Sequence, residues 1–119
     1  MNAKFAYLAI AIVVMANVAG QILFKVTADH VRAKAEQGVA AYFANPWIWL
    51  ALLFYGGAIV VWIRLLQSVP LSAAYPAMAL VFVLVPLAGI VLFHEAQGPR
   101  FFAGVVLIAV GVWLTSARP

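Results

Sequence analysis

The chain has 119 residues, of which 68% are hydrophobic and only 8% are charged. Soluble domains average about 45–50% apolar and about 25% charged residues, so this composition excludes an ordinary soluble protein and indicates a single membrane domain over residues 1–119. There is no cysteine, which excludes disulfides and thiolate metal ligands. The net charge of +4 comes from scattered residues and not from a basic run, so we expect no nucleic-acid partner.

Four apolar segments are each long enough to cross a bilayer, which takes about 20 residues of helix. In chain order they cover residues 5–24, 46–67, 72–93 and 100–117. Lipid offers the backbone no hydrogen-bond partner, so each segment is predicted to be a helix. The expected fold is therefore an all-α membrane protein with four transmembrane helices. The first segment also fits a cleaved signal peptide weakly, but three more spans follow it, and we interpret it as a spanning helix.

The first segment places polar side chains at four-residue intervals, at Asn17, Gln21 and Lys25. A four-residue step rises about 6 Å along a helix, so these residues are predicted to form a ladder on one face, from mid-membrane to one surface. Polar groups at such depth usually face other helices or a wet cavity, and an ammonium at the mouth of a polar groove is suited to a phosphate. The alternative is structural: the amides hydrogen-bond across helices and Lys25 reaches the headgroups.

Residues 25–45 form the only sizeable polar segment. Their composition favours a continuation of the first helix beyond the membrane, with a stop near Gly38. The sequence VAAYF, residues 39–43, is then expected to return along the interface. Asn45 and Pro46 are typical of an N-cap and a first helical residue, so the next helix is predicted to begin there.

The remaining connections, residues 68–72 and 94–99, are short. Short turns make neighbouring helices antiparallel, so both termini are expected on one side of the membrane. Lysines and arginines divide almost evenly between the two sides, so the sequence predicts no orientation.

Two polar side chains mark the second and third segments. Arg64 lies near the end of the second segment and is a candidate second phosphate contact, with extension to the headgroups as the structural alternative. Tyr75 is a candidate hydrogen-bond partner for a ligand, although tyrosine near an interface is often an anchor. Pro76 and Pro86 are predicted to kink the third helix, because each removes a backbone donor.

Glu95 is the only acidic residue near a predicted span, because Asp29 and Glu36 belong to the polar connection. The pair His94 and Glu95 has too few ligands for a metal site. It either caps the turn or places Glu95 against Arg100. No Ser–His–acid set, phosphate loop or carboxylate pair is visible, so we expect no enzyme, no cofactor and no metal.

The fourth segment places Gly104, Ile108 and Gly111 on one helix face. Small residues on a face permit close helix packing, either within the monomer or between subunits. Four short helices enclose little volume, so this face is predicted to be a dimer interface.

The span order and the fourth segment resemble the small multidrug resistance family of the drug/metabolite transporters. That family's fourth helix carries a Gly-x-x-Leu-Ile-x-x-Gly-Val dimerisation motif. The matching residues are Gly104, Leu107, Ile108, Gly111 and Val112. The sequence LFHEAQGPRFFAGVVLIAVGVWL also resembles the EamA-type transporters.

One departure from the family concerns an essential helix-one glutamate of its drug exporters, which binds protons and cationic drugs in turn. Alignment of ANVAGQILFK with that segment places Asn17 at the position of the glutamate. An amide does not titrate, which argues against proton-coupled drug export by the usual route.

The chain is more similar to a branch of the superfamily that lacks this glutamate. This branch consists of the paired ArnE- and ArnF-type subunits, which are proposed to flip undecaprenyl-phosphate-aminoarabinose. The ArnE-like segments VAGQ…K, VP…AYP and HE…PR are matched by Val18–Gln21 with Lys25, by Val69, Pro70 and Ala74–Pro76, and by His94, Glu95, Pro99 and Arg100. The resemblance covers nearly the whole chain. It implies a multi-pass protein of the bacterial inner membrane, a homodimer or a heterodimer with a related four-helix subunit, and a lipid-linked sugar used in lipid A modification and polymyxin resistance.

The polar residues of the chain have the chemistry to bind a lipid with an anionic headgroup, and the apolar spans are expected to contact membrane lipids. Lys25 is predicted to hold the phosphate, and Gln21 and Asn17 the sugar hydroxyls. Further candidate substrate contacts are Arg64, Tyr75 and Glu95. Two alternatives stay open: a small-molecule exporter of cationic drugs or metabolites that uses Glu95 or no protonation, and a non-transporting subunit that scaffolds a glycosyltransferase.

Overall fold

The computed structural model describes residues 2–34 and 38–116, and these residues form helices joined by short connections. In chain order they are α1 (Ala3–Ala33), α2 (Val39–Phe43), α3 (Pro46–Leu66), α4 (Leu71–Ala74), the 3-10 helix η1 (Tyr75–Leu80), α5 (Val81–Phe93) and α6 (Pro99–Ser116). Four candidate membrane spans result, because α4, η1 and α5 run on as one element over Leu71–Phe93. The predicted fold class is confirmed; residue 117 of the fourth predicted span lies outside the described residues.

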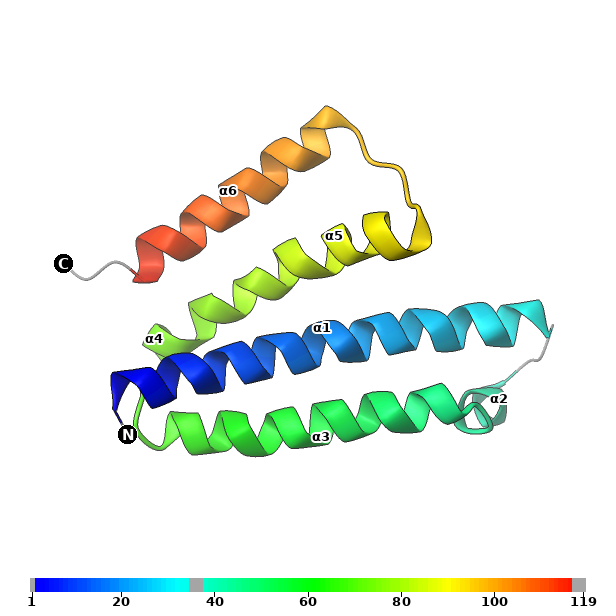
Figure 1. Ribbon diagram of the computed structural model, residues 1–119, viewed down its shortest axis with the longest axis horizontal. Coiled ribbons are helices and arrows are strands. Elements are labelled where there is room, and N and C mark those ends of the chain that lie inside the picture. Colours follow the sequence, from blue (N-terminus) through cyan, green and yellow to red (C-terminus); the bar gives the residue numbers. More distant parts are fainter. Residues whose placement is uncertain (1, 35–37, 117–119) are drawn as a thin grey trace.

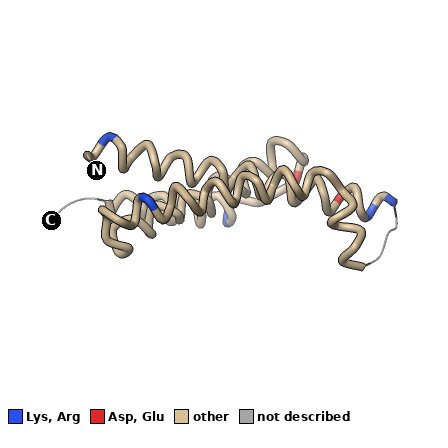
Figure 2. Tube along the Cα trace, turned by 90° about the horizontal axis from the view of Figure 1, so that it is seen from below, with Lys and Arg blue, Asp and Glu red and all other residues tan. Residues whose placement is uncertain are grey.

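The four spans lie side by side in a single layer, in the spatial order α3, α1, α4–η1–α5 and α6 (Figure 1). The Cα trace measures 53 × 37 × 19 Å along its principal axes, and the layer is thin when it is seen edge-on (Figure 2). Spans that follow one another in the chain run antiparallel, whereas α1 and α5, which are neighbours in the layer, run in the same direction (Figure 1). As a result, α1 begins and α6 ends toward the same end of the layer (Figure 1).

The best-packed part of the layer is the pair α1 and α3. Small residues of α1, among them Ala9, Val13 and Val18, are buried, and α3 buries Ala51, Ala58 and Leu65. Small side chains let the two backbones approach closely, which is how helices associate in lipid. Leu65 is fully buried and forms a cluster with Ala9 and Ala74, which also fixes the start of the third span.

The third span is irregular where its first proline lies. Pro76 falls within the 3-10 helix η1, and Pro86 lies inside α5. The sequence predicted a kink at each proline, because each removes one backbone donor. The structure has 3-10 geometry at Pro76, whereas α5 continues as one helix through Pro86. The fourth span, α6, packs mainly against η1 and less against α5. The irregular segment therefore positions α6.

The helix ends follow the predicted capping residues, with one correction. Asn45 caps α3, since its Oδ1 accepts a hydrogen bond of 3.0 Å from the Trp47 amide, and Pro46 is the first helical residue. The first helix does continue beyond its apolar span, but it ends at Ala33 rather than near Gly38. Gly38 instead precedes α2 with φ +91°, a conformation that glycine adopts without strain.

The half of the layer that contains η1, α5 and α6 has no buried residue among those described. Its side chains are half-buried or exposed, and they are almost all apolar. In a bilayer such faces meet lipid tails or another transmembrane helix. One copy of this chain thus covers little of its own third and fourth spans.

Candidate functional site

A groove of about 560 Å³ opens between α1 and the C-terminal end of α5. Its polar lining consists of Gln21, Lys25, Glu95 and Gln97. The apolar lining consists of Ile22, Phe24, Val85, Pro86, Gly89, Phe93 and Phe101. Two of the three ladder residues predicted from the sequence therefore lie in one groove, together with the predicted contact Glu95. Ligand sites of small molecules typically measure about 300–1,000 Å³ and combine apolar walls with a few polar groups, as here.

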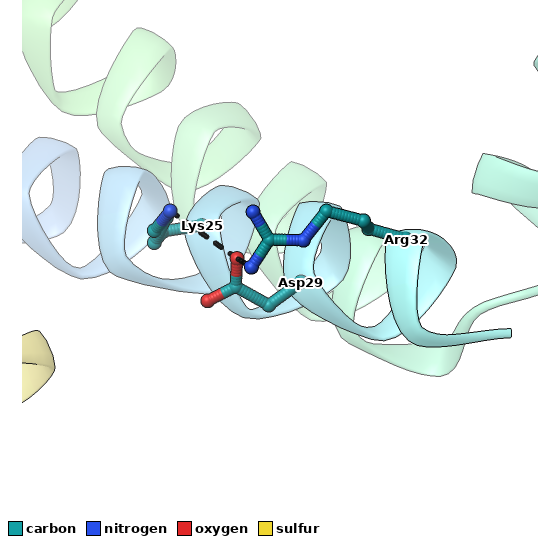
Figure 3. A network of polar contacts seen from close by, with 3 residues as sticks. All are labelled: Lys25, Asp29 and Arg32. Carbon is teal, nitrogen blue, oxygen red and sulfur yellow. Dashed lines mark hydrogen bonds and ion pairs between the residues drawn. The ribbon is translucent and has the colours of Figure 1, made fainter. Parts of the chain in front are cut away.

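The α1 wall of the groove is positively charged. Lys25 Nζ lies 3.2 Å from Asp29 Oδ1, and Arg32 Nη2 lies 3.3 Å from the same oxygen (Figure 3). Two cations thus share one carboxylate, which leaves this network with one net positive charge. The ion pairs are at the helix spacings i,i+4 and i,i+3, and the side chains are partly exposed, so each pair is weak and can yield to a ligand.

Gln21 is held in the groove by an aromatic residue of α3. Its Nε2 donates a hydrogen bond of 2.6 Å to the hydroxyl of Tyr55. The ring of Tyr55 stacks on Phe24 with centroids 5.3 Å apart, and it lies directly over Gly20. Because Gly20 has no side chain, the ring can approach α1 and place its hydroxyl beside Gln21.

Replacing Tyr55 by Phe is expected to lower the unfolding free energy by about 0.6 kcal/mol, and by no more than about 1.7 kcal/mol. The change removes the hydrogen bond to Gln21 but keeps the stacked ring. Thermal unfolding in detergent measures the effect. Tyr42, an exposed tyrosine of α2, provides the control substitution Tyr42→Phe, for which no loss is expected. Equal losses in both variants would contradict the assigned hydrogen bond.

Asn17 does not share the groove, which corrects the prediction of one continuous polar face. Its Nδ2 donates a 3.0 Å hydrogen bond to the Val13 carbonyl, and its side chain lines a separate recess of about 180 Å³ between α1, α3 and η1. Each four-residue step rotates about 40° around a helix, so Asn17 and Lys25 differ by about 80°. The two recesses adjoin at Tyr55, which lines this one and binds Gln21 of the other.

The same recess contains Tyr75, the candidate contact predicted at the start of the third span. Its ring meets Trp62 edge-on, with centroids 6.2 Å apart. The predicted ligand contacts Asn17 and Tyr75 are therefore brought together, although they lie apart from Gln21, Lys25 and Glu95.

Arg64 lies at the opposite end of the layer from Lys25. It lines a recess of about 410 Å³ with Asn2, Phe5, Gln67 and Ser68. Along α1, Phe5 and Lys25 are about 30 Å apart, which is close to the thickness of the hydrocarbon core. The two predicted phosphate contacts thus belong to opposite membrane surfaces and cannot bind one headgroup at the same time.

Glu95 follows the end of α5, where His94 adopts a left-handed conformation with φ 56°. The Glu95 amide donates to the Gly89 carbonyl at 3.4 Å, and the Glu95 carboxylate lies against Gly89 in the groove. Across residues 2–34 and 38–116, no cation lies within ion-pair distance of Glu95, so the proposed pair with Arg100 is not formed. No metal-binding group of three or more His, Asp or Glu exists in the described part of the chain.

Sequence reasoning missed several groove residues. Tyr55, Gln97 and Gly89 were not among the candidates, yet all three shape the groove or its contents. The contact of Gly20 with an aromatic ring on a neighbouring helix has no signature in the sequence of either helix alone.

On α6, Gly104 and Ile108 are half-buried and Gly111 is exposed. Apart from its chain neighbours and the backbone of its own helix, a Cβ atom at either glycine would meet no atom of the described residues within 4 Å. Packing within the chain therefore does not require glycine at these two positions.

Comparison with known proteins shows the family of this chain. The chain is 45% identical over 95 residues to a probable 4-amino-4-deoxy-L-arabinose-phosphoundecaprenol flippase subunit ArnE of Pseudomonas aeruginosa, with 80% of this chain and 83% of that protein covered. The chain belongs to the ArnE family. A Pseudomonas savastanoi ArnE protein is 37% identical over 79% of this chain and 82% of its own, and one from Escherichia coli O139:H28 is 46% identical over 56% and 60%.

No family model matches the chain, and no solved structure matches it significantly. The resemblance to ArnE-like subunits that the short motifs indicated is nevertheless confirmed over most of the chain. These relatives are named probable flippase subunits, which makes them membrane transporters rather than enzymes, and the four candidate spans of this chain fit that class.

Proposed function

We propose that this ArnE-family protein is one subunit of a flippase that moves a polyprenyl-phosphate-linked amino sugar across the bacterial inner membrane. The names of its relatives support the cargo, and so does the groove between α1 and α5. The groove combines a cationic wall for a phosphate, amide groups for sugar hydroxyls, and apolar sides that suit a lipid whose tail stays in the bilayer. This combination is the observation on which the proposal chiefly depends.

In this proposal, Lys25 binds the phosphate at one membrane surface, where the headgroup enters or leaves the groove. A polyprenyl phosphodiester carries one negative charge, which matches the one net positive charge of Lys25, Asp29 and Arg32. Gln21 donates to a sugar hydroxyl by exchanging its bond with Tyr55 for one with the ligand.

The second recess and Arg64 supply the remainder of the path. The recess with Asn17 and Tyr75 adjoins the groove at Tyr55, and it gives the sugar an amide and a hydroxyl between Lys25 and Arg64. Arg64 then attracts the phosphate at the opposite surface. A cation at each surface favours the headgroup in either leaflet, and the polar middle lowers the barrier between them.

The working flippase in this proposal contains a partner, either a second copy or a related four-helix subunit. The single layer leaves η1, α5 and α6 largely uncovered, and Gly104 and Gly111 have open space beside them. A partner helix at Gly104, Ile108 and Gly111 would use that space and close the path from lipid. The word subunit in the names of the relatives agrees with such a partner.

Reconstitution tests the proposed function. Proteoliposomes that contain the lipid-linked amino sugar are treated with a membrane-impermeant oxidant of vicinal diols, with and without an imposed pH gradient. We expect the internal half of the lipid to become accessible when this chain and its partner are present, but not in empty vesicles. Gradient-driven uptake of quaternary ammonium compounds, without lipid flipping, would instead support a cation exporter and contradict the proposal.

A further inference from the structure

The two walls of the groove carry opposite charges that do not neutralise each other. Lys25 on α1 and Glu95 after α5 both line the groove, yet Lys25 pairs with Asp29 of its own helix. Within the described ranges, the Glu95 carboxylate has neither an ion pair nor a side-chain hydrogen bond. A ligand in the groove therefore meets a cationic wall on one side and an anionic wall on the other.

The backbone holds the carboxylate in this place. The Glu95 amide bonds to the Gly89 carbonyl at 3.4 Å, which folds the residue back over the end of α5. At Gly89, a Cβ atom would lie 3.2 Å from Glu95 Cδ and would overlap its Oε2. The carboxylate thus occupies the space that a side chain at position 89 would fill. The position of the carboxylate in the groove therefore depends on Glu95 and on the absence of a side chain at Gly89.

A carboxylate without a cation is suited to one class of ligand group. A hydrogen bond between two charged groups is roughly twice as strong as one between neutral groups, so a protonated amine gains more here than a hydroxyl does. A metal ion would need three or four ligands, and the described residues offer no such group. A headgroup with a phosphate at one end and an ammonium at the other matches both walls.

We propose that Glu95 is the specificity residue of the groove and selects polyprenyl phosphates whose sugar carries a protonated primary amine. The inference rests on the proposed flippase function and adds the basis of discrimination: Lys25 takes the phosphate, and Glu95 takes the amine. A lipid with a hydroxyl in place of the amine leaves the carboxylate without its cation and is transported less well.

The test compares two lipids that differ only in this group, the amino sugar and its hydroxyl counterpart, in vesicles with the complete flippase. The diol-cleaving oxidant attacks both lipids, and the flipping rate of each is normalised to the oxidation of the same lipid in the outer leaflet. The wild-type protein should transport the amino form faster. Glu95→Gln should reduce the ratio of the two rates about tenfold, by slowing the amino form alone, because it removes one charge-assisted hydrogen bond. Glu95→Asp should retain part of the preference.

Gly89→Ala provides an independent variant that keeps the glutamate. The added methyl group displaces the carboxylate from its place, so the preference should fall as it does in Glu95→Gln, while alanine suits the helix. An undiminished preference in Glu95→Gln would overturn the inference, as would equal wild-type rates for the two lipids. Both of these results leave the flippase function intact, whereas a wild-type protein that flips neither lipid would overturn the proposed function as well.

Discussion

Replacing Lys25 by Gln is expected to lower lipid flipping at least about tenfold. The variant removes the ammonium that lines the groove but keeps a polar side chain of similar length. A hydrogen bond that involves a charged group contributes about 1.5–3 kcal/mol, and about 1.4 kcal/mol corresponds to a factor of ten in affinity. The oxidant assay in proteoliposomes measures the rate, and detergent unfolding shows whether the variant is folded.

Lys34→Gln is the matched control for Lys25→Gln. Lys34 is an exposed lysine that caps the C-terminus of the same helix, and it does not line the groove. Both variants remove one positive charge from the same side of the membrane, so a general loss of attraction to anionic lipids would affect them alike. Equal slowing of flipping by the two variants, or unchanged flipping by Lys25→Gln, would remove the role assigned to Lys25.

Replacing Gly20 by Ala is expected to destabilise the packing of α1 against α3. A Cβ atom at Gly20 would lie 2.8 Å from Tyr55 Cδ2 and would overlap Cε2 of the same ring. The Tyr55 ring also stacks on Phe24, and its hydroxyl accepts a hydrogen bond from Gln21, so the ring has little freedom to move aside. Overpacking of this kind costs about 1–3 kcal/mol of unfolding free energy, which thermal unfolding in detergent would detect.

Gly56→Ala is the opposing control. Gly56 lies inside α3, and a Cβ atom there would meet no atom of the described residues within 4 Å apart from its chain neighbours and the backbone of its own helix. Alanine is favoured over glycine in a helix by about 1 kcal/mol, so this variant should be no less stable than the wild type. The two substitutions are chemically identical, so similar effects at both positions would contradict the close approach of Tyr55 to α1.

The sequence was sufficient to predict the helices, because each depends on local properties. Apolar length predicted the four spans, and Asn45 with Pro46 predicted the start of α3. Helix ends without such signals were less predictable. The end of α1, for example, was predicted near Gly38, but the helix ends at Ala33.

The candidate site was only partly predictable, because it depends on how the helices pack. The four-residue spacing placed Gln21 and Lys25 correctly in one groove, but the rotation of the helix turns Asn17 into a neighbouring recess. Tyr55 was not recognised because its role depends on Gly20 of another helix. Similarly, Glu95 was a candidate by type alone, and only its approach to Gly89 shows where its carboxylate lies.

Photo-crosslinking tests most directly the central claim that the groove between α1 and α5 holds the lipid headgroup. Phe101 of α6 lines the groove, whereas Leu107 of the same helix is 72% exposed and does not line it. The photo-crosslinker p-benzoylphenylalanine is placed at position 101 in one variant and at position 107 in the other. Each variant is studied in vesicles that contain the lipid-linked amino sugar. We expect mass spectrometry to find the sugar lipid attached at position 101 but not at 107, with the adduct lost when Lys25 is also replaced by Gln. Equal attachment at both positions, or an adduct that persists without Lys25, would contradict the account.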